Sequence, residues 1–263
     1  MILQNRIAVV YGAAGAVGSA VARAFAAEGA RLFLTGRQHA PVEALARDIV
    51  SAGGSAEAAE VDALDEQAVD RHLQSVVEQA GRLDISFNAV GVPDAKILGV
   101  PLVDIDAEQF ILPIAAYTRS YFLTARLAAR RMLPNRSGVI MTISALPARM
   151  GARWNGGYGP AQAAKEAMTR DLSAELAPEG IRVVGLRPHG MPATDSLKEV
   201  FETKSPRTGM NWEQYRGLLA GMTHPRRVML VEEVAQMAAF MASDKASGMT
   251  GTTVNMTMGN LDD

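Results

Sequence analysis

The chain has 263 residues, enough for two small domains, but its strands and helices alternate evenly and predict a single core. Hydrophobic residues make up 48% of it and charged residues 21%, which is ordinary for a globular protein. The formal net charge of −2 provides no broad basic surface for nucleic acid. There is no cysteine, which excludes disulfides and thiolate chemistry.

Histidine spacing and hydropathy exclude two further classes. His39, His72, His189 and His224 are too scattered to form a ligand set, so we predict no metal. The opening segment lacks the charged and long apolar regions of a signal peptide, and no stretch reaches the roughly eighteen apolar residues that a membrane span needs. We therefore expect a cytoplasmic protein without nucleic-acid or membrane partners.

Runs rich in valine, isoleucine and leucine alternate with segments of helical period, which is typical of a parallel sheet. The predicted strands are Ile7–Tyr11, Arg31–Thr35, Ala56–Val61, Ile85–Asn88, Gly138–Ser144, Arg182–Arg187 and Thr252–Met256. The predicted helices are Val17–Glu28, Val42–Ala52, Glu66–Ala80, Ala107–Met132, Gly159–Ala177 and Val231–Ser243, with Gly29, Gly53, Gly81 and Gly180 near their ends. The fold class is α/β: a doubly wound, Rossmann-type, seven-stranded parallel sheet with helices on both faces, in one domain spanning residues 1–263.

Residues 191–223 break this alternation, because they are polar, contain proline and are weakly periodic around Trp212 and Tyr215. We expect a lid over a substrate cleft, and the alternative is a surface helical hairpin that only packs. Its aromatic rings and the methionines at 191, 210 and 222 suit a bulky hydrophobic substrate, or packing of the lid against the core.

A glycine-rich turn, Gly12-Ala13-Ala14-Gly15-Ala16-Val17-Gly18, follows the first strand and opens an alanine-rich helix. Gly12 permits the tight turn, Gly15 allows close approach of a pyrophosphate, and Gly18 allows the helix to pack on the strand. The helix N-terminus presents unpaired N–H groups to the phosphates. We predict a dinucleotide site, and a purely structural turn is the alternative.

The second strand ends in Leu34-Thr35-Gly36-Arg37, without the carboxylate that would bind the ribose 2′-OH of NAD. Gly36 leaves room for a 2′-phosphate, and Arg37 can pair with it through two N–H groups. NADP(H) is therefore favoured, with NAD(H) possible. The alternative is that Arg37 is a solvated turn residue.

Several segments together resemble the short-chain dehydrogenase/reductase family, and the resemblance runs from Asn5 to Gly259. These segments are YGAAGAVG at 11–18, VDALD at 61–65, LDISFNAVG at 83–91, VIMTIS at 139–144, GGYGPAQAAKEAMTRDLSAELAPEGIRVVGLRP at 156–188 and EEVAQMAAFMASDKASGMTGTTVN at 232–255. Two departures are NAVG, where the family usually has NNAG, and a glycine spacing that looks like that of the family's extended members.

The resemblance implies a set of cofactor contacts along the sheet edge. Asp62 would contact adenine, Asn88 with Ala89 and Gly91 would lie near the ribose, and Pro188 would begin the loop over the nicotinamide. The full predicted set is Gly12, Ala14, Gly15, Val17, Gly18, Arg37, Asp62, Ala63, Asn88, Ala89, Gly91 and Pro188.

The resemblance also implies a catalytic tyrosine, Tyr158, which exchanges a proton with the substrate oxygen. The family's lysine stands four residues later, where this chain has Gln162. A neutral amide cannot stabilise a phenolate, so acid–base power is reduced. Lys165 lies on the same helix face two turns from Tyr158, and we interpret it as a solvated or interface lysine rather than a substitute.

Other catalytic positions also differ. The family's serine aligns with Ala145, so Ser144, one residue earlier, either reaches the substrate oxygen or is an ordinary strand-end serine. Tyr117 stands where the family has a helix asparagine. His189, after Pro188, titrates in the right range for acid–base work or is simply a loop histidine, and Arg149 and Arg153 are further candidates.

These observations predict an NADP-preferring oxidoreductase that transfers a hydride between cofactor and a carbonyl or alcohol substrate, with altered catalysis at Tyr158, Ser144, Gln162 and His189. The alternatives are a cofactor-binding protein without turnover, such as a sensor, scaffold or partner subunit, and a non-redox enzyme on the same fold. Resemblance of two helices to the family's subunit interface implies a homodimer or homotetramer.

Overall fold

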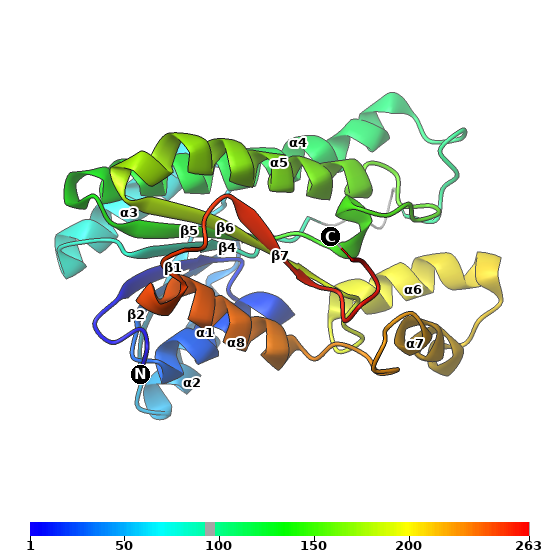
Figure 1. Ribbon diagram of the computed structural model, residues 1–263, viewed down its shortest axis with the longest axis horizontal. Coiled ribbons are helices and arrows are strands. Elements are labelled where there is room, and N and C mark those ends of the chain that lie inside the picture. Colours follow the sequence, from blue (N-terminus) through cyan, green and yellow to red (C-terminus); the bar gives the residue numbers. More distant parts are fainter. Residues whose placement is uncertain (93–97, 263) are drawn as a thin grey trace.

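The computed structural model describes residues 1–92 and 98–262, and its seven described strands form one parallel sheet between two layers of helices (Figure 1). The spatial order is β3-β2-β1-β4-β5-β6-β7. The strands are β1 (Ile7–Tyr11), β2 (Arg31–Gly36), β3 (Ser55–Glu60), β4 (Ile85–Asn88), β5 (Gly138–Ile143), β6 (Ile181–Pro188) and β7 (Thr252–Met256). The predicted α/β class and Rossmann-type sheet are confirmed.

The order of the strands reverses between β1 and β4. Ala8 on β1 pairs with Leu32 on β2 at one side and with Ile85 on β4 at the other. Because the strands are parallel, their carboxyl ends share one edge of the sheet. Chains that leave β1 and β4 at this edge turn to opposite sides and open the crevice in which such sheets bind ligands.

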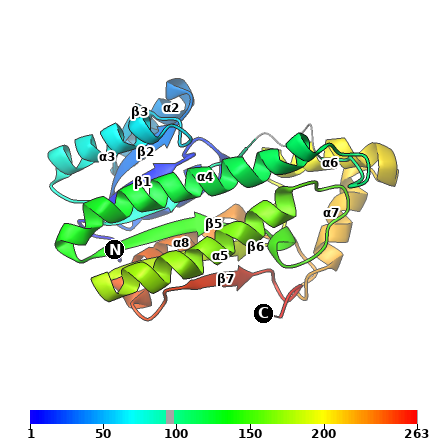
Figure 2. The ribbon, with the colours of Figure 1, turned by 90° about the horizontal axis from the view of Figure 1, so that it is seen from above.

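Helices cover both faces of the sheet (Figures 1 and 2). One face carries α3 (Glu66–Ala80), α4 (Ala107–Met132) and α5 (Tyr158–Leu176), and the other carries α1 (Ala16–Ala27), α2 (His39–Ser51) and α8 (Val231–Ala242). Alternate residues of β1 supply the two cores, with Ala8 and Val10 facing α1 and Val9 and Tyr11 facing α4. Short 3₁₀ turns are η1 (Leu133–Asn135), η2 (Leu146–Ala148), η3 (Ala177–Glu179) and η4 (Asp244–Ala246).

The predicted helices and strands all form, with ends that differ by up to three residues. The four glycines expected near helix ends have positive φ angles of 92°, 87°, 78° and 79° at positions 29, 53, 81 and 180. This conformation favours glycine because it has no β-carbon.

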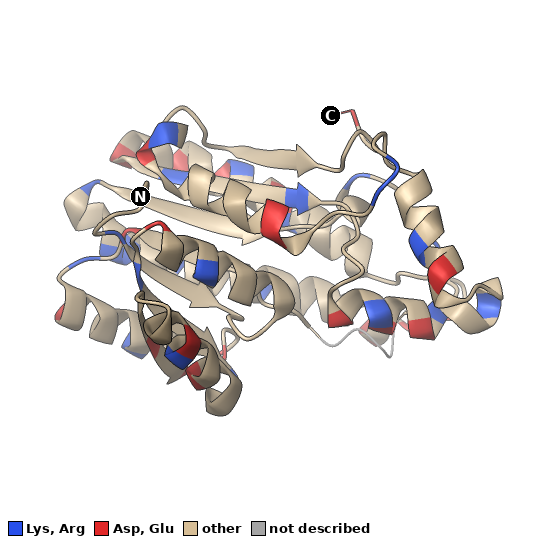
Figure 3. Cartoon of the chain, turned by 90° about the horizontal axis from the view of Figure 1, so that it is seen from below, with Lys and Arg blue, Asp and Glu red and all other residues tan. Residues whose placement is uncertain are grey.

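Residues 191–223 form two helices, α6 (Asp195–Thr208) and α7 (Trp212–Gly221), beyond the carboxyl edge of the sheet (Figure 1). No residue of α6 is fully buried, which explains its weak apolar periodicity. Acidic and basic residues are interspersed along its ribbon (Figure 3). The rings of Trp212 and Tyr215 pack against Phe201, with centroid distances of 5.1 and 5.4 Å, so these aromatics hold the hairpin together.

No helix in the described part of the chain is both long and apolar enough to cross a bilayer.

Asp84 ties the amino-terminal edge of the sheet together. Its carboxylate is 2% exposed, accepts the Ile7 N–H at 2.9 Å and forms ion pairs with Arg6 and Arg82. Arg6 also pairs with Asp244 at 2.5 Å, but that carboxylate is 85% exposed. Arg6 therefore pairs with one buried carboxylate, Asp84, and with one exposed carboxylate, Asp244.

Asp84→Ala should lower the free energy of unfolding by about 2–3 kcal/mol, because it leaves the buried Ile7 N–H without an acceptor and removes a charged hydrogen bond. Asp244→Ala is the matched control and should change it by less than about 0.5 kcal/mol, since exposed pairs contribute little. Urea denaturation followed by circular dichroism measures both, and equal losses would contradict this account.

Candidate active site

The glycine turn sits at the point where the strand order reverses. Gly12 has a φ of +71°, and a β-carbon there would lie 2.7 Å from the Ala89 carbonyl oxygen at the end of β4. A β-carbon on Gly18 would overlap the Gly12 carbonyl. Both glycines therefore serve the close packing that the sequence predicts for them.

The first turn of α1 has the features of a phosphate site. Gly15 caps the helix in an extended conformation and no side chain accepts hydrogen bonds from the first turn. Ala14, Gly15 and Ala16 are exposed, and Val17 is half-buried. Backbone N–H groups at a helix N-terminus bind phosphate without a basic side chain, so these residues fit a dinucleotide's pyrophosphate.

Arg37 is exposed at the end of β2 and, with Gly91, lines a cavity of about 500 Å³ beside α6. The lid contributes five polar side chains to this cavity: Asp195, Ser196, Lys198, Glu199 and Glu202. The predicted cofactor residues Arg37 and Gly91 therefore face residues of α6 across this cavity.

The other predicted cofactor residues divide by exposure. Asp62 is exposed and its carboxylate accepts the Leu64 N–H at 2.9 Å, whereas Ala63 and Pro188 are buried. Asn88 is also buried. Its side-chain amide donates to Ser120 and Thr124 at 3.0 Å each and so ties β4 to α4. The side chain of Asn88 therefore joins β4 to α4, and the prediction that Asn88 lies near the ribose stays a prediction.

Tyr158 begins α5 and is half-buried. The preceding residue, Gly157, lies so close to α4 that a β-carbon there would overlap the Phe110 carbonyl. This contact brings the Tyr158 ring against that of Tyr117, with centroids 5.8 Å apart and planes at 76°. The edge-to-face arrangement fixes the position of the catalytic candidate.

Gln162 and Lys165, on the next two turns of α5, are 2% and 1% exposed. The interpretation of Lys165 as a solvated lysine is wrong, because its ammonium donates to the Ile143 carbonyl inside the protein. Its Nζ lies 5.4 Å from the centroid of the Tyr117 ring. Burial lowers the pKa of Lys165 to about 7. The sequence indicated that Lys165 shares a helix face with Tyr158, because residues seven apart lie on the same face of a helix.

Ser144 is 5% exposed, and its hydroxyl donates to Glu166 on α5 at 2.8 Å and to the Leu186 carbonyl at 3.3 Å. Glu166 in turn accepts from Arg187 on β6 at 2.9 and 3.1 Å, forming a buried ion pair. This ion pair was not predicted from the sequence. It engages the Ser144 hydroxyl, so the structure favours a strand-end serine over one that orients the substrate oxygen.

His189 is 1% exposed, at the end of β6. Burial lowers its pKa, an effect that the Gly190 backbone opposes only in part. Neither ring nitrogen makes a hydrogen bond of good geometry with the described residues. The ring is therefore neutral at pH 7, as a base would require, and its role stays a prediction.

The lid contacts the loop that precedes Tyr158. Lys204 on α6 donates to the Arg153 carbonyl at 2.9 Å and to the Asn155 side chain. The Arg207 guanidinium lies 5.8 Å from the Trp154 ring centroid, and Arg153 lies 6.0 Å from it on its own loop. These contacts join α6 to the loop that precedes Tyr158, and Arg153 is engaged with Trp154. The role of residues 191–223 as a lid stays a prediction.

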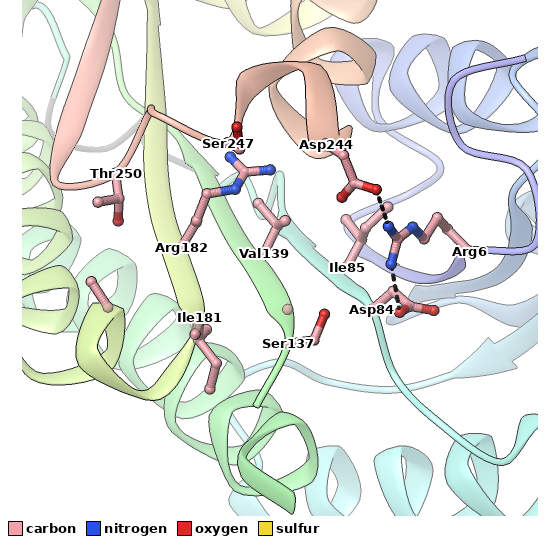
Figure 4. A pocket seen from close by; sticks show the side chains of 14 residues that line it. Arg6, Asp84, Ile85, Ser137, Val139, Ile181, Arg182, Asp244, Ser247 and Thr250 are labelled. Carbon is pink, nitrogen blue, oxygen red and sulfur yellow. Dashed lines mark hydrogen bonds and ion pairs between the residues drawn. The ribbon is translucent and has the colours of Figure 1, made fainter. Parts of the chain in front are cut away.

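A second cavity, of about 340 Å³, lies at the opposite edge of the sheet (Figure 4). Arg6, Asp84, Arg182 and Asp244 line it, and their charges balance. Open parallel sheets bind ligands at their carboxyl edge, so this cavity is not the candidate active site. In residues 1–92 and 98–262, no three acidic or histidine side chains converge as a metal site would require.

Comparison with known proteins gives matches over almost the whole chain. Residues 12–260 match the family described as enoyl-(acyl carrier protein) reductase. The chain is 31% identical over 252 residues to an uncharacterized oxidoreductase, YxbG, of Bacillus subtilis, which covers 96% of this chain and 89% of that protein. It is 30% identical over 251 residues to secoisolariciresinol dehydrogenase of Forsythia intermedia, covering 95% of this chain and 86% of that protein.

Among solved structures, sorbitol-6-phosphate 2-dehydrogenase of Erwinia amylovora superimposes with a TM-score of 0.90 at 25% identity. The match covers 97% of this chain and 100% of the other. This superposition shows that the two chains share the same overall fold.

Proposed function

Because this chain belongs to the short-chain dehydrogenase/reductase family, we propose that it transfers a hydride between NADP(H) and the carbonyl or alcohol carbon of a small molecule. It is an NAD(P)-dependent oxidoreductase, in keeping with relatives named as dehydrogenases and oxidoreductases. The preference for NADP(H), the substrate and the state of the catalytic residues belong to the proposal.

The observation that carries the proposal is the position of Tyr158 at the same sheet edge as the glycine turn. Tyr158 follows the loop after β5, and the turn follows β1, so parallel strands deliver both to one side. The uncapped α1 N-terminus supports a pyrophosphate there. A phenol beside a bound nicotinamide is suited to proton exchange with a substrate oxygen.

When bound, the reduced nicotinamide supplies a hydride to the carbonyl carbon. The Tyr158 hydroxyl donates its proton to the carbonyl oxygen as the C–H bond forms, and the tyrosinate then takes a proton from water. Tyr117 holds the Tyr158 ring in place through its edge-to-face contact. Lid helix α6, joined to the loop before Tyr158 by Lys204, excludes water from the reacting atoms.

A second candidate is a cofactor-binding protein without turnover. Gln162 favours it, because an amide stands where the family has a lysine. Assays distinguish the two candidates, since both bind nucleotide and only the first consumes it.

Two further parts of the proposal concern the whole molecule. Exposed apolar side chains on α4, at Ile111, Leu112 and Phe122, support a homodimer or homotetramer. The half-buried aromatic rings of the lid support either a hydrophobic substrate or internal packing, and their contacts with Phe201 favour packing.

Tyr158→Phe should reduce carbonyl reduction at least about 100-fold, because it removes the proton donor but keeps the ring that packs on Tyr117. Oxidation of NADPH over a panel of ketones and aldehydes measures this, with nucleotide affinity as the control. Wild-type levels of turnover in Tyr158→Phe would contradict the assignment, and absence of any wild-type turnover would support the binding-only candidate.

Arg37→Ala should weaken NADPH binding about tenfold and leave NADH within about twofold, because only the first carries a 2′-phosphate. Lid carboxylates Glu199 and Glu202 in the same cavity oppose the phosphate and keep the effect moderate. Nucleotide fluorescence titration measures both affinities. Arg23→Ala, on the exposed face of α1, is the matched control, and an equal loss for the two nucleotides in Arg37→Ala would remove the preference for NADP(H).

A further inference from the structure

Lys165 is a buried cation that the steps above do not use. Among residues 1–92 and 98–262, no carboxylate forms an ion pair with it, and the adjacent Glu166 is turned to Arg187. The Ile143 carbonyl is its hydrogen-bond acceptor. Burying an ammonium with one neutral acceptor costs free energy that an apolar side chain of the same length would not.

The aromatic rings above Lys165 connect it to the catalytic tyrosine. Its Nζ lies 5.4 Å from the Tyr117 ring centroid, within the range of a cation–π contact. Tyr117 meets Tyr158 edge to face at 5.8 Å. Lys165 thus contacts Tyr117, and Tyr117 contacts Tyr158. We call these three residues the column.

We propose that Lys165, acting through Tyr117, supplies the positive charge that the position of Gln162 lacks and so stabilises the tyrosinate form of Tyr158. Lys165 is a positioning residue in this scheme, because it does not touch the substrate. The proposal rests on the proposed function for its catalytic consequence, but its effect on Tyr158 exists in the protein alone.

The expected size of the effect follows from electrostatics. Through an interior of effective dielectric about 20, a unit charge about 10 Å away shifts an acid dissociation constant roughly tenfold. The charge must be present, and burial lowers the pKa of Lys165 to about 7. The effect is therefore full below that pH and disappears as the pH rises through it.

The described titratable groups beside the column do not substitute for Lys165. From α4, Tyr117 and Tyr121 face α5, and burial raises the pKa of Tyr121 well above its ordinary value. On β6, Arg187 is neutralised by Glu166. Among these described groups, Lys165 is the cation without a carboxylate partner, so its removal should change the reactivity of Tyr158.

The test measures the reactivity of Tyr158 without cofactor or substrate. An aryl sulfonyl fluoride reacts with a tyrosinate, forming a sulfur–oxygen bond and releasing fluoride, so the labelling rate reports the tyrosinate fraction. At about pH 6.5, below the pKa of Lys165, Lys165→Met should slow labelling of Tyr158 about tenfold, as followed by peptide mass spectrometry. Exposed Lys245→Met is the matched control and should label at the wild-type rate.

Two further variants separate the charge from the packing. Gln162→Lys combined with Lys165→Met returns a cation to α5 and should restore the labelling rate to within about threefold of wild type or above it. Tyr117→Phe keeps the ring and should label within about threefold of wild type. Lys165→Gln, which keeps a polar side chain of similar length without the charge, should slow labelling about tenfold and decides the question if Lys165→Met does not fold.

The kinetic readout follows the same pattern. Lys165→Met should lower kcat about tenfold at about pH 6.5, with KM and nucleotide affinity within about twofold, and the difference from wild type should shrink above about pH 8. Unchanged labelling and kcat in folded Lys165→Met would overturn the proposal. Labelling that depends on Lys165 in a protein without turnover would uphold it and reject the proposed function instead.

Discussion

The close contact of Gly157 with the backbone of α4 is the constraint on which the site depends. A β-carbon at this position would overlap the Phe110 carbonyl, so only glycine lets α5 begin where it does. Tyr158 then meets Tyr117 at once, and the buried face of α5 continues with Gln162 and Lys165. One backbone contact thus places the whole column of side chains at the sheet edge.

Two buried cations occupy this region and are compensated differently. Arg187 has an ion-pair partner in Glu166, which also accepts a hydrogen bond from Ser144, so the pair carries no net charge. Lys165 has a single carbonyl and the face of an aromatic ring. The first arrangement secures β5, β6 and α5 to one another. The surroundings of Lys165 leave its ammonium facing the Tyr117 ring without a carboxylate that neutralises it. The replacement of the family's lysine by Gln162 therefore does not remove every cation from this helix face.

Much of the fold could be predicted from the sequence, since apolar runs, helical periods and capping glycines are local signals. The need for glycine at positions 12 and 18 could also be predicted, because the residues that form this turn are neighbours in the sequence. The burial of Lys165 and the hydrogen bond from Ser144 to Glu166 could not be predicted, because both join segments that are far apart in the sequence: Tyr117 is 48 residues from Lys165, and Ser144 is 22 residues from Glu166. The helical hairpin of residues 191–223 was predicted only as an alternative and without bounds, because α6 buries no complete face that would give it an apolar period.

The central claim is that this altered site still transfers hydride. Incubation with NADPH in which both hydrogens at nicotinamide C4 are replaced by deuterium, in the presence of a panel of ketones and aldehydes, tests it most directly through mass spectrometry of the alcohol products. The account predicts that one equivalent of deuterium appears on the former carbonyl carbon of at least one product. Bound nucleotide with no deuterium in any product would contradict it and leave a cofactor-binding protein.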